Sequence, residues 1–218
     1  KSKLQDDRGY PYLGDIDTYF WWRYAENVLK NGHPGDELRN PNTGELCYKQ
    51  KKDCVPWDNH MNAPKGYDVT PDHFHAYFEA FVYKIVHFFN NNITLKDVVF
   101  FISALIVALA IIPAFFIAKG IAGNFAGAIA AIVVAINPFL LTRTAGGVAD
   151  TDPYNVMFPL LITWLYLESL KSKSIIKKIA LAASSGLLAG LYSFAWNGWW
   201  FIFDFIIAAS IIYLVYSL

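Results

Sequence analysis

Long hydrophobic runs follow one another in the C-terminal half of the chain, separated by short polar breaks. Each run approaches the ~20 residues that a helix needs to cross the hydrocarbon core of a bilayer. The pattern predicts an all-α, polytopic membrane helix bundle of about five spans over residues 98–218. The expected spans are residues 98–118, 121–141, 156–170, 179–192 and 201–218.

Residues 1–97, here called the head, hold most of the charged residues and all the histidines. Residues 17–30 have helical spacing, an acidic start at Asp17 and the helix stop Asn31-Gly32. Residues 73–89 carry an apolar stripe but are too polar to span, which predicts an interfacial helix. The Pro-, Gly- and Asn-rich segment 33–70 is expected to be a long structured loop, so the head is a large and mainly helical external loop region.

The distribution of lysines between the spans predicts the orientation. Basic residues near span ends are retained in the cytoplasm. They lie between the first and second expected spans and between the third and fourth: Lys119, Lys171, Lys173, Lys177 and Lys178. The head, residues 142–155 and residues 196–200 are therefore expected on the extracytoplasmic face of a cell membrane, with Arg143 as the one basic residue that opposes this orientation.

Composition agrees with a bilayer environment. The chain is 55% hydrophobic, with a mean hydropathy of +0.30, which exceeds that of an ordinary soluble domain. The formal net charge is zero, and the basic residues are scattered among carboxylates. Membrane lipid is thus an expected partner and nucleic acid is not.

Two cysteines, Cys47 and Cys54, flank a Lys/Gln-rich turn in the head. On an extracytoplasmic face this spacing favours a small disulfide hairpin. The alternative is a zinc site, but only His60 lies close enough in sequence to be a further ligand.

Two acidic pairs carry the candidate chemistry. Asp150 and Asp152 follow a Gly-containing break between spans, and Asp15 and Asp17 begin the head helix on the same predicted face. Carboxylates beside a bilayer are costly unless they are paired, solvated or bound to a cation, and Mg²⁺ or Mn²⁺ prefers such oxygen ligands. Helix capping is the alternative role for each pair, but two pairs on one face favour a metal site.

Two other features have open interpretations. Gly146 and Gly147 permit close backbone approach to a ligand or, equally, helix packing. Trp196, Trp199 and Trp200 are typical of an interfacial aromatic belt, and they are also suited to wall a lipid-linked sugar site.

These motifs resemble the catalytic subunit of oligosaccharyltransferase, the family of eukaryotic Stt3, archaeal AglB and bacterial PglB. The first acidic motif is similar in Asp15-x-Asp17, Tyr19, Arg23, Ala25-Glu26-Asn27 and Asn31-Gly32. The second is similar in Arg143-Thr144, Gly147 and Asp150-Thr151-Asp152. Thr18 departs from the Pro that the family often has after its first motif.

The resemblance implies a GT-C type fold and inverting transfer of an oligosaccharide from a polyprenyl or dolichyl phosphate carrier to Asn of an Asn-x-Ser/Thr acceptor. It assigns a metal ligand and acceptor contact to Asp17, a metal ligand to Asp150, and a metal ligand or its partner to Asp152, with Mn²⁺ or Mg²⁺ as cofactor. It further implies substrate contacts, which we place at Arg23, His73, Arg143, Trp196 and Trp199.

Several parts of the family are absent from this sequence: the first span, a later external loop and the C-terminal soluble domain. We therefore expect the chain by itself to be inactive. Three alternatives stay open, namely another polyprenyl-phosphate-dependent glycosyltransferase such as a protein O-mannosyltransferase, a membrane transporter and a non-catalytic scaffold. Transport is disfavoured because the acidic residues lie at the ends of spans.

Overall fold

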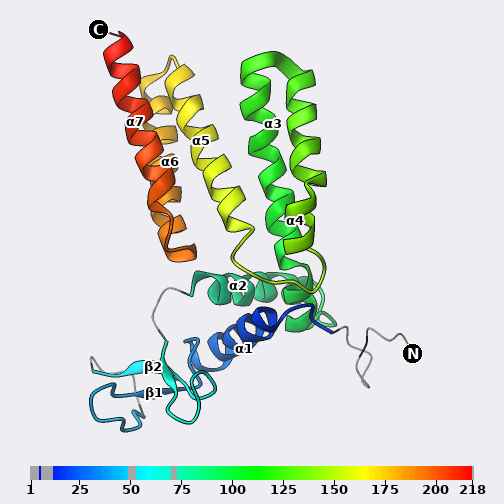
Figure 1. Cartoon of the computed structure of the whole chain (residues 1–218), viewed down its shortest axis with the longest axis vertical. Helices are drawn as coiled ribbons and strands as arrows, with labels where there is room; N and C mark the ends of the chain where they lie inside the picture. Colours follow the sequence, from blue (N-terminus) through cyan, green and yellow to red (C-terminus); the bar gives the residue numbers. More distant parts are fainter. Residues whose placement is uncertain (1–4, 6–11, 49–52, 70–72, 218) are drawn as a thin grey trace. The chain divides into compact units, whose positions relative to one another are not determined.

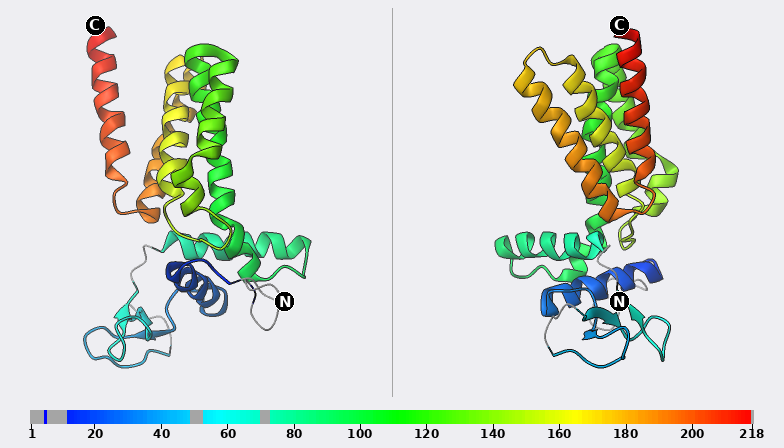
Figure 2. Two further views of the ribbon diagram at one scale, coloured as in Figure 1. Left: turned by 45° about the vertical axis from the view of Figure 1, so that its right-hand side comes forward. Right: turned by 90° about the vertical axis from the view of Figure 1, so that its left-hand side faces the viewer.

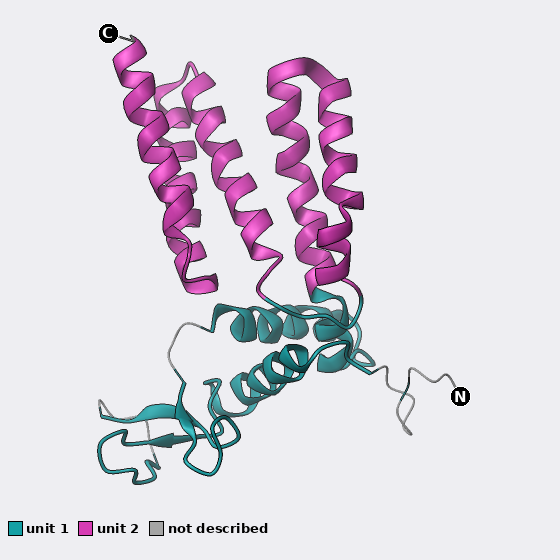
Figure 3. Ribbon diagram, in the orientation of Figure 1, with its two compact units in different colours: residues 1–102, 146–150 teal, residues 103–145, 151–218 magenta. Residues whose placement is uncertain are grey.

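The structure is a computed structural model that describes residues 5, 12–48, 53–69 and 73–217. The chain divides into two compact units (Figure 3). Unit 1 comprises residues 1–102 and 146–150, and unit 2 comprises residues 103–145 and 151–218. The described residues are mostly helical, with one small sheet, which confirms the expected all-α class.

Two helices form the core of unit 1. Helix α1 (Ile16–Asn31) packs on α2 (Phe74–Phe89), as Figures 1 and 2 show. Ala25 of α1 and Ala76 of α2 are fully buried, and these small residues let the two helices approach closely around the buried ring of Tyr24. Apolar side chains on one face of α1 complete this core: Phe20, Trp21 and Val28.

The segment between these helices, expected to be a long structured loop, contains a three-stranded antiparallel sheet. Strand β1 (Glu37–Arg39) pairs with β2 (Val55–Asp58), and β2 pairs with β3 (Tyr67–Asp68). In the register Trp57 lies opposite Glu37 on one side and Asp68 on the other. The short strands place Asp58 at the end of β2, where it contacts α1.

Helix α3 (Leu95–Ile136) is the longest element and is two helices joined at a kink. The backbone leaves helical geometry at Ala122 and Gly123, and Gly123 adopts φ +83°, which favours glycine. The chain reverses there, so that the two arms run side by side (Figures 1 and 2). The arms coincide with the first two expected spans, and the short α4 (Pro138–Arg143) follows.

The rest of unit 2 consists of α5 (Tyr154–Lys171), α6 (Ile175–Ala195) and α7 (Trp200–Ser217). The hydroxyl of Ser185 donates to the carbonyl of Ile162 at 3.0 Å, which links α6 to α5. Trp164 of α5 stacks on Phe116 of α3 with ring centroids 4.9 Å apart. The three helices occupy the positions of the third, fourth and fifth expected spans.

Two helices of the described part, α3 and α6, are long and apolar enough to cross a membrane by length and composition, and Trp200–Tyr216 is a shorter apolar helix. Large apolar side chains of α7 are exposed, including Phe205 at 68% and Ile212 at 69%. Such a contiguous apolar surface is typical of a face that contacts lipid or another protein. How many helices cross the bilayer stays a prediction.

Candidate functional site

The first acidic motif begins helix α1. Asp15 is the N-cap residue, and its carboxylate accepts the backbone N–H of Asp17 at 3.4 Å. Asp17 lies in the first turn, where the helix dipole favours a negative charge. Both residues are exposed. Asp15 serves as the helix cap, and the carboxylate of Asp17 stays accessible to solvent.

The second acidic motif ends a loop that packs on the beginning of α3. The backbone N–H of Gly147 donates to the carbonyl of Phe100 at 2.8 Å. Gly147 has φ +90°, and a Cβ on Gly146 would lie 2.6 Å from the Phe100 ring. The backbone conformation of Gly147 thus favours glycine, and a side chain at Gly146 would force the Phe100 ring to move.

Two hydrogen bonds join these motifs within unit 1. The backbone N–H of Gly14 donates to the carbonyl of Gly147 at 2.7 Å. The backbone N–H of Ala149 donates to the hydroxyl oxygen of Thr18 at 2.9 Å. Because Thr18 follows Asp17 and Ala149 precedes Asp150, the contacts bring the two acidic motifs together.

The electrostatics of Asp17 reflect this convergence. The pKa of Asp17 is raised, first by partial burial of its carboxyl, and then by the negative charges of Asp15 and Asp150. Asp150 is itself half-buried. Asp17 and Asp150 therefore lie near enough for their charges to interact, and a hard divalent cation held by such oxygen ligands would relieve this repulsion.

Asp152 and Arg143 lie in unit 2. Their side chains form an ion pair of 3.3 Å, and they are 36% and 53% exposed, so the pair contributes little to stability. Both border a cavity of 210 Å³ with an apolar wall that includes Leu140 and Val156. The cavity has room for a small group, and the ion pair supplies its polar side.

Arg23 is held by carboxylates of the head. Its guanidinium donates to Asp36 and to Asp58 at 3.0 Å each. The fully buried Asp58 also accepts the hydroxyl of Tyr24 at 2.8 Å and the backbone N–H of His60 at 2.7 Å. Arg23 thereby anchors α1 to the sheet.

The pKa of Asp58 lies well below its usual range. Burial opposes ionisation of this carboxyl, but hydrogen bonds from Arg23, the backbone N–H of Met61 and the hydroxyl of Tyr24 outweigh it. Within the described part of the chain, one group of three residues has the ligand types and spacing to hold a metal ion. It consists of Asp36, Asp58 and His60, whose ligand atoms lie within 4.8 Å of one another. The guanidinium of Arg23 already supplies positive charge at this point, so we assign the group no metal.

The remaining predicted contacts lie on aromatic clusters. The ring of His73, at the start of α2, packs edge-on against Tyr24 at 5.0 Å. In unit 2, Trp196 stacks on Tyr192 at 6.0 Å, and Trp199 packs on Phe203 at 5.8 Å. Trp196 stays 38% exposed, so it retains surface for a ligand or for lipid.

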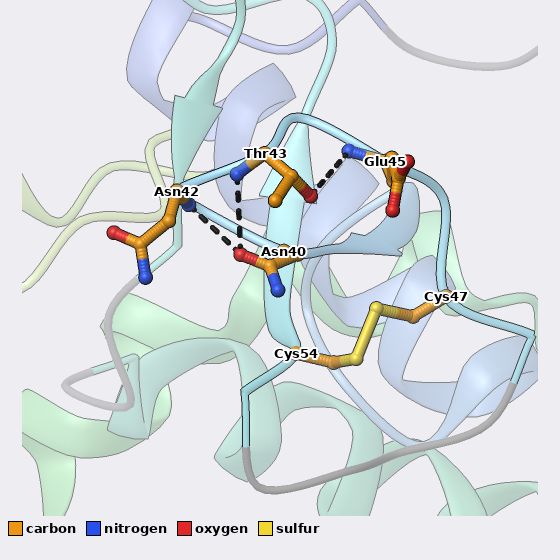
Figure 4. Close-up of a disulfide and its surroundings, with 6 residues drawn as sticks. All are labelled: Asn40, Asn42, Thr43, Glu45, Cys47 and Cys54. Carbon is orange, nitrogen blue, oxygen red and sulfur yellow. Dashed lines mark hydrogen bonds between the residues drawn. A yellow bond between two sulfur atoms is a disulfide. The ribbon is translucent and has the colours of Figure 1, made fainter.

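Cys47 and Cys54 form a disulfide in the head (Figure 4). The backbone N–H of Cys47 donates to the carbonyl of Leu38 at 2.8 Å, and the side chain of Asn40 organises the adjacent turn. Both sulfurs are engaged, so neither cysteine is a zinc ligand in this state. Residues 49–52 of the predicted Lys/Gln-rich turn lie outside the described residues.

Sequence reasoning did not find Thr18, Gly14, Asp36 or Asp58 as parts of these networks. Their partners are distant along the chain, and no periodic pattern marks them. The available signal was indirect, because an Arg on a helix that also carries buried aromatic residues requires a carboxylate partner.

The chain is similar to known proteins in sequence and in fold. Residues 2–218 match the family model for the N-terminal part of oligosaccharyl transferase STT3. The chain is 31% identical to a dolichyl-phosphooligosaccharide-protein glycotransferase of Methanococcus voltae over 218 residues, and 29% identical to one of Methanocaldococcus jannaschii over 175 residues. The alignments cover 98% and 79% of this chain but only 23% and 18% of those relatives.

Solved structures agree in fold. An Archaeoglobus fulgidus oligosaccharyltransferase in complex with Zn and sulfate superposes with a TM-score of 0.71 at 21% identity, over 95% of this chain and 24% of that one. The AglB protein of the same organism, in complex with an inhibitory peptide and a dolichol-phosphate, gives 0.67 at 22% identity over 91% and 22%. The expected family resemblance, including its archaeal members, is confirmed: the chain belongs to the STT3 family of oligosaccharyl transferases.

Proposed function

We propose that the full-length protein is an integral membrane, metal-dependent glycosyltransferase that moves an oligosaccharide from a dolichyl or polyprenyl phosphate carrier to Asn of an Asn-x-Ser/Thr acceptor. The names of the curated relatives support the reaction class. The observation that carries the proposal in this chain is the convergence of Asp17 and Asp150, made by the contacts of Gly14 and Thr18 with the second motif.

The carboxylates of Asp17 and Asp150 would hold Mn²⁺ or Mg²⁺, and the family resemblance makes Asp152 a further ligand or a partner of a ligand. The negative charges of Asp15 and Asp150, which add to burial in raising the pKa of Asp17, support this proposal, because a bound divalent cation would offset them. When bound, the ion would offset negative charge on the departing phosphate. Asp15 takes no part in this set, because its carboxylate caps α1.

Asp17 has a second role toward the acceptor. An amide nitrogen is a poor nucleophile, because its lone pair is delocalised into the carbonyl. A carboxylate that accepts the amide N–H orients the nitrogen and weakens this delocalisation. The nitrogen then bonds to the anomeric carbon of the sugar, the bond from that carbon to the phosphate oxygen breaks, and the nitrogen loses a proton to a basic group, for which Asp17 is the candidate in this chain.

The carrier would lie along the aromatic and basic side chains of the same predicted face. Trp196 and Trp199 offer ring surface for a sugar or a polyprenyl chain. Arg143 and His73 are the candidate contacts to phosphate, and Arg23 stays a predicted contact that also holds the head together. Extracytoplasmic location of these groups follows from the lysine distribution alone.

The test compares Asp17→Asn and Asp150→Asn in the full-length protein with the wild type. Transfer of a lipid-linked oligosaccharide to an acceptor peptide, with Mn²⁺ supplied, should fall by orders of magnitude in kcat for each variant. A matched control is Asp68→Asn, an exposed carboxylate on β3, which should transfer normally. A peptide with Gln in place of the acceptor Asn controls for specificity. Normal kcat in both acidic variants would exclude the proposal.

A further inference from the structure

Thr18 is buried where its neighbours are exposed. Its side chain has no exposed surface, whereas Asp17 and Tyr19 on either side reach solvent. The Thr18 hydroxyl oxygen accepts the backbone N–H of Ala149, which is also fully buried. Water therefore cannot replace the hydroxyl as the partner of this amide, and loss of the acceptor leaves a buried donor unsatisfied.

The position of the hydrogen bond gives it a consequence for the acidic motifs. The donor is the residue immediately before Asp150, and the acceptor is the residue immediately after Asp17. The other link, from Gly14 to Gly147, joins backbone groups and so does not depend on a particular side chain. Thr18 supplies the link that does depend on residue type.

The tether acts against repulsion between carboxylates. Asp15, Asp17 and Asp150 carry like charges near one another, and like charges favour separation when no cation is bound. A loop fixed at Ala149 cannot carry Asp150 away from Asp17 without breaking the buried hydrogen bond. Binding then does not have to order the loop, and this lowers the cost of association.

We propose that Thr18 is a positioning residue, whose hydroxyl holds the backbone of the second acidic motif so that Asp150 stays near Asp17 before a divalent cation binds. This rests on the proposed function, since it takes the two aspartates as the metal ligands. Thr18 is fully buried, so the proposed role requires no contact of its side chain with the cation or the substrate.

The experiment measures Mn²⁺ binding by electron paramagnetic resonance titration in the full-length protein, together with hydrogen exchange of the Ala149 amide without metal. Thr18→Val keeps the shape and removes the acceptor, while Thr18→Ser keeps the hydroxyl. Thr18→Val should raise the Kd for Mn²⁺ roughly 10–100-fold, the range found when groups that orient metal ligands are removed. It should also speed hydrogen exchange at the Ala149 amide. Thr18→Ser should keep the wild-type Kd for Mn²⁺ and the wild-type exchange rate.

A control variant separates this effect from loss of any buried hydroxyl. Ser185 donates a hydrogen bond to Ile162 within unit 2, and Ser185→Ala should leave the Kd for Mn²⁺ unchanged. If Thr18→Val does not fold, Thr18→Cys carries the same test, because a thiol is a weak acceptor of similar size.

The outcomes distinguish the two proposals. If Asp17→Asn and Asp150→Asn abolish transfer while Thr18→Val binds Mn²⁺ and protects Ala149 as the wild type does, the positioning role is overturned and the proposed function stands. If Asp150→Asn keeps both transfer and Mn²⁺ affinity, both proposals are overturned. A weaker Kd in Thr18→Val that Thr18→Ser restores supports the positioning role.

Discussion

The backbone N–H of Gly14 donates a hydrogen bond of 2.7 Å to the carbonyl oxygen of Gly147, and the contact needs a glycine at position 147. Gly147 has φ +90°, a conformation that residues with a side chain rarely adopt. A Cβ there would lie 3.3 Å from the Gly14 nitrogen and 3.1 Å from the Phe100 ring. The turn thus combines a backbone conformation and a close approach that only glycine satisfies.

Replacement of Gly147 by Ala should therefore destabilise unit 1. The left-handed conformation alone costs a residue with a Cβ roughly 1–2 kcal/mol, and the contact with Phe100 adds to this. Thermal unfolding of the full-length protein should show the loss. Gly186→Ala is the control, because Gly186 is helical with open space around it and should gain about 0.5–1 kcal/mol. Equal stability of Gly147→Ala and wild type would contradict the assignment.

Removal of the Asp58 carboxylate should weaken the head more than removal of a surface charge. Asp58→Ala leaves the guanidinium of Arg23 and the hydroxyl of Tyr24 without this partner. The expected loss is about 3 kcal/mol, the lower end for breaking a buried ion pair, because Asp36 still pairs with Arg23. Chemical denaturation monitored by tryptophan fluorescence measures it.

The control for Asp58→Ala is the exposed ion pair between Glu26 and Lys30 on α1. Glu26→Ala should cost less than about 0.5 kcal/mol, since solvent screens such pairs. A loss in Asp58→Ala no greater than that in Glu26→Ala would show that the Arg23 network does not anchor α1.

The same network predicts loss of stability in acid. The pKa values of Asp36 and Asp58 are lowered in the folded state, through hydrogen bonds that overcome burial. Groups with lowered pKa values stabilise the fold fully above their unfolded pKa, which is ~3.9 for Asp. This contribution disappears as the pH falls through the lower, folded-state pKa values.

Unfolding free energies measured from about pH 5 to about pH 2 test this expectation. The wild type should lose stability across this window, and Asp58→Asn should lose less, because it lacks one of the two titrating groups. Asp68→Asn, which changes an exposed carboxylate, should follow the wild-type curve. Identical pH profiles for wild type and Asp58→Asn would show that the lowered pKa of Asp58 does not cause the loss of stability in acid.

The sequence by itself determined the elements whose signals are local. The apolar runs located the helices of unit 2, and helical spacing with the Asn31-Gly32 stop located α1. Gly32 ends α1 with φ +79°, and its backbone N–H donates to the carbonyl of Val28. The amphipathic stripe located α2. These features depend on neighbours within a few turns, so pattern and propensity suffice. The sheet was not expected, because its strands are short and set in a Pro- and Gly-rich segment.

Only the tertiary structure decided what joins the acidic motifs. Asp17 and Asp150 could be placed on one face of a membrane from the spans between them, but the hydrogen bonds that join their neighbouring residues could not be predicted. Thr18 appeared in the sequence only as a departure from a family pattern, and in the fold it accepts the Ala149 amide. Such a contact between residues far apart in the chain depends on how whole elements pack, which no local pattern encodes.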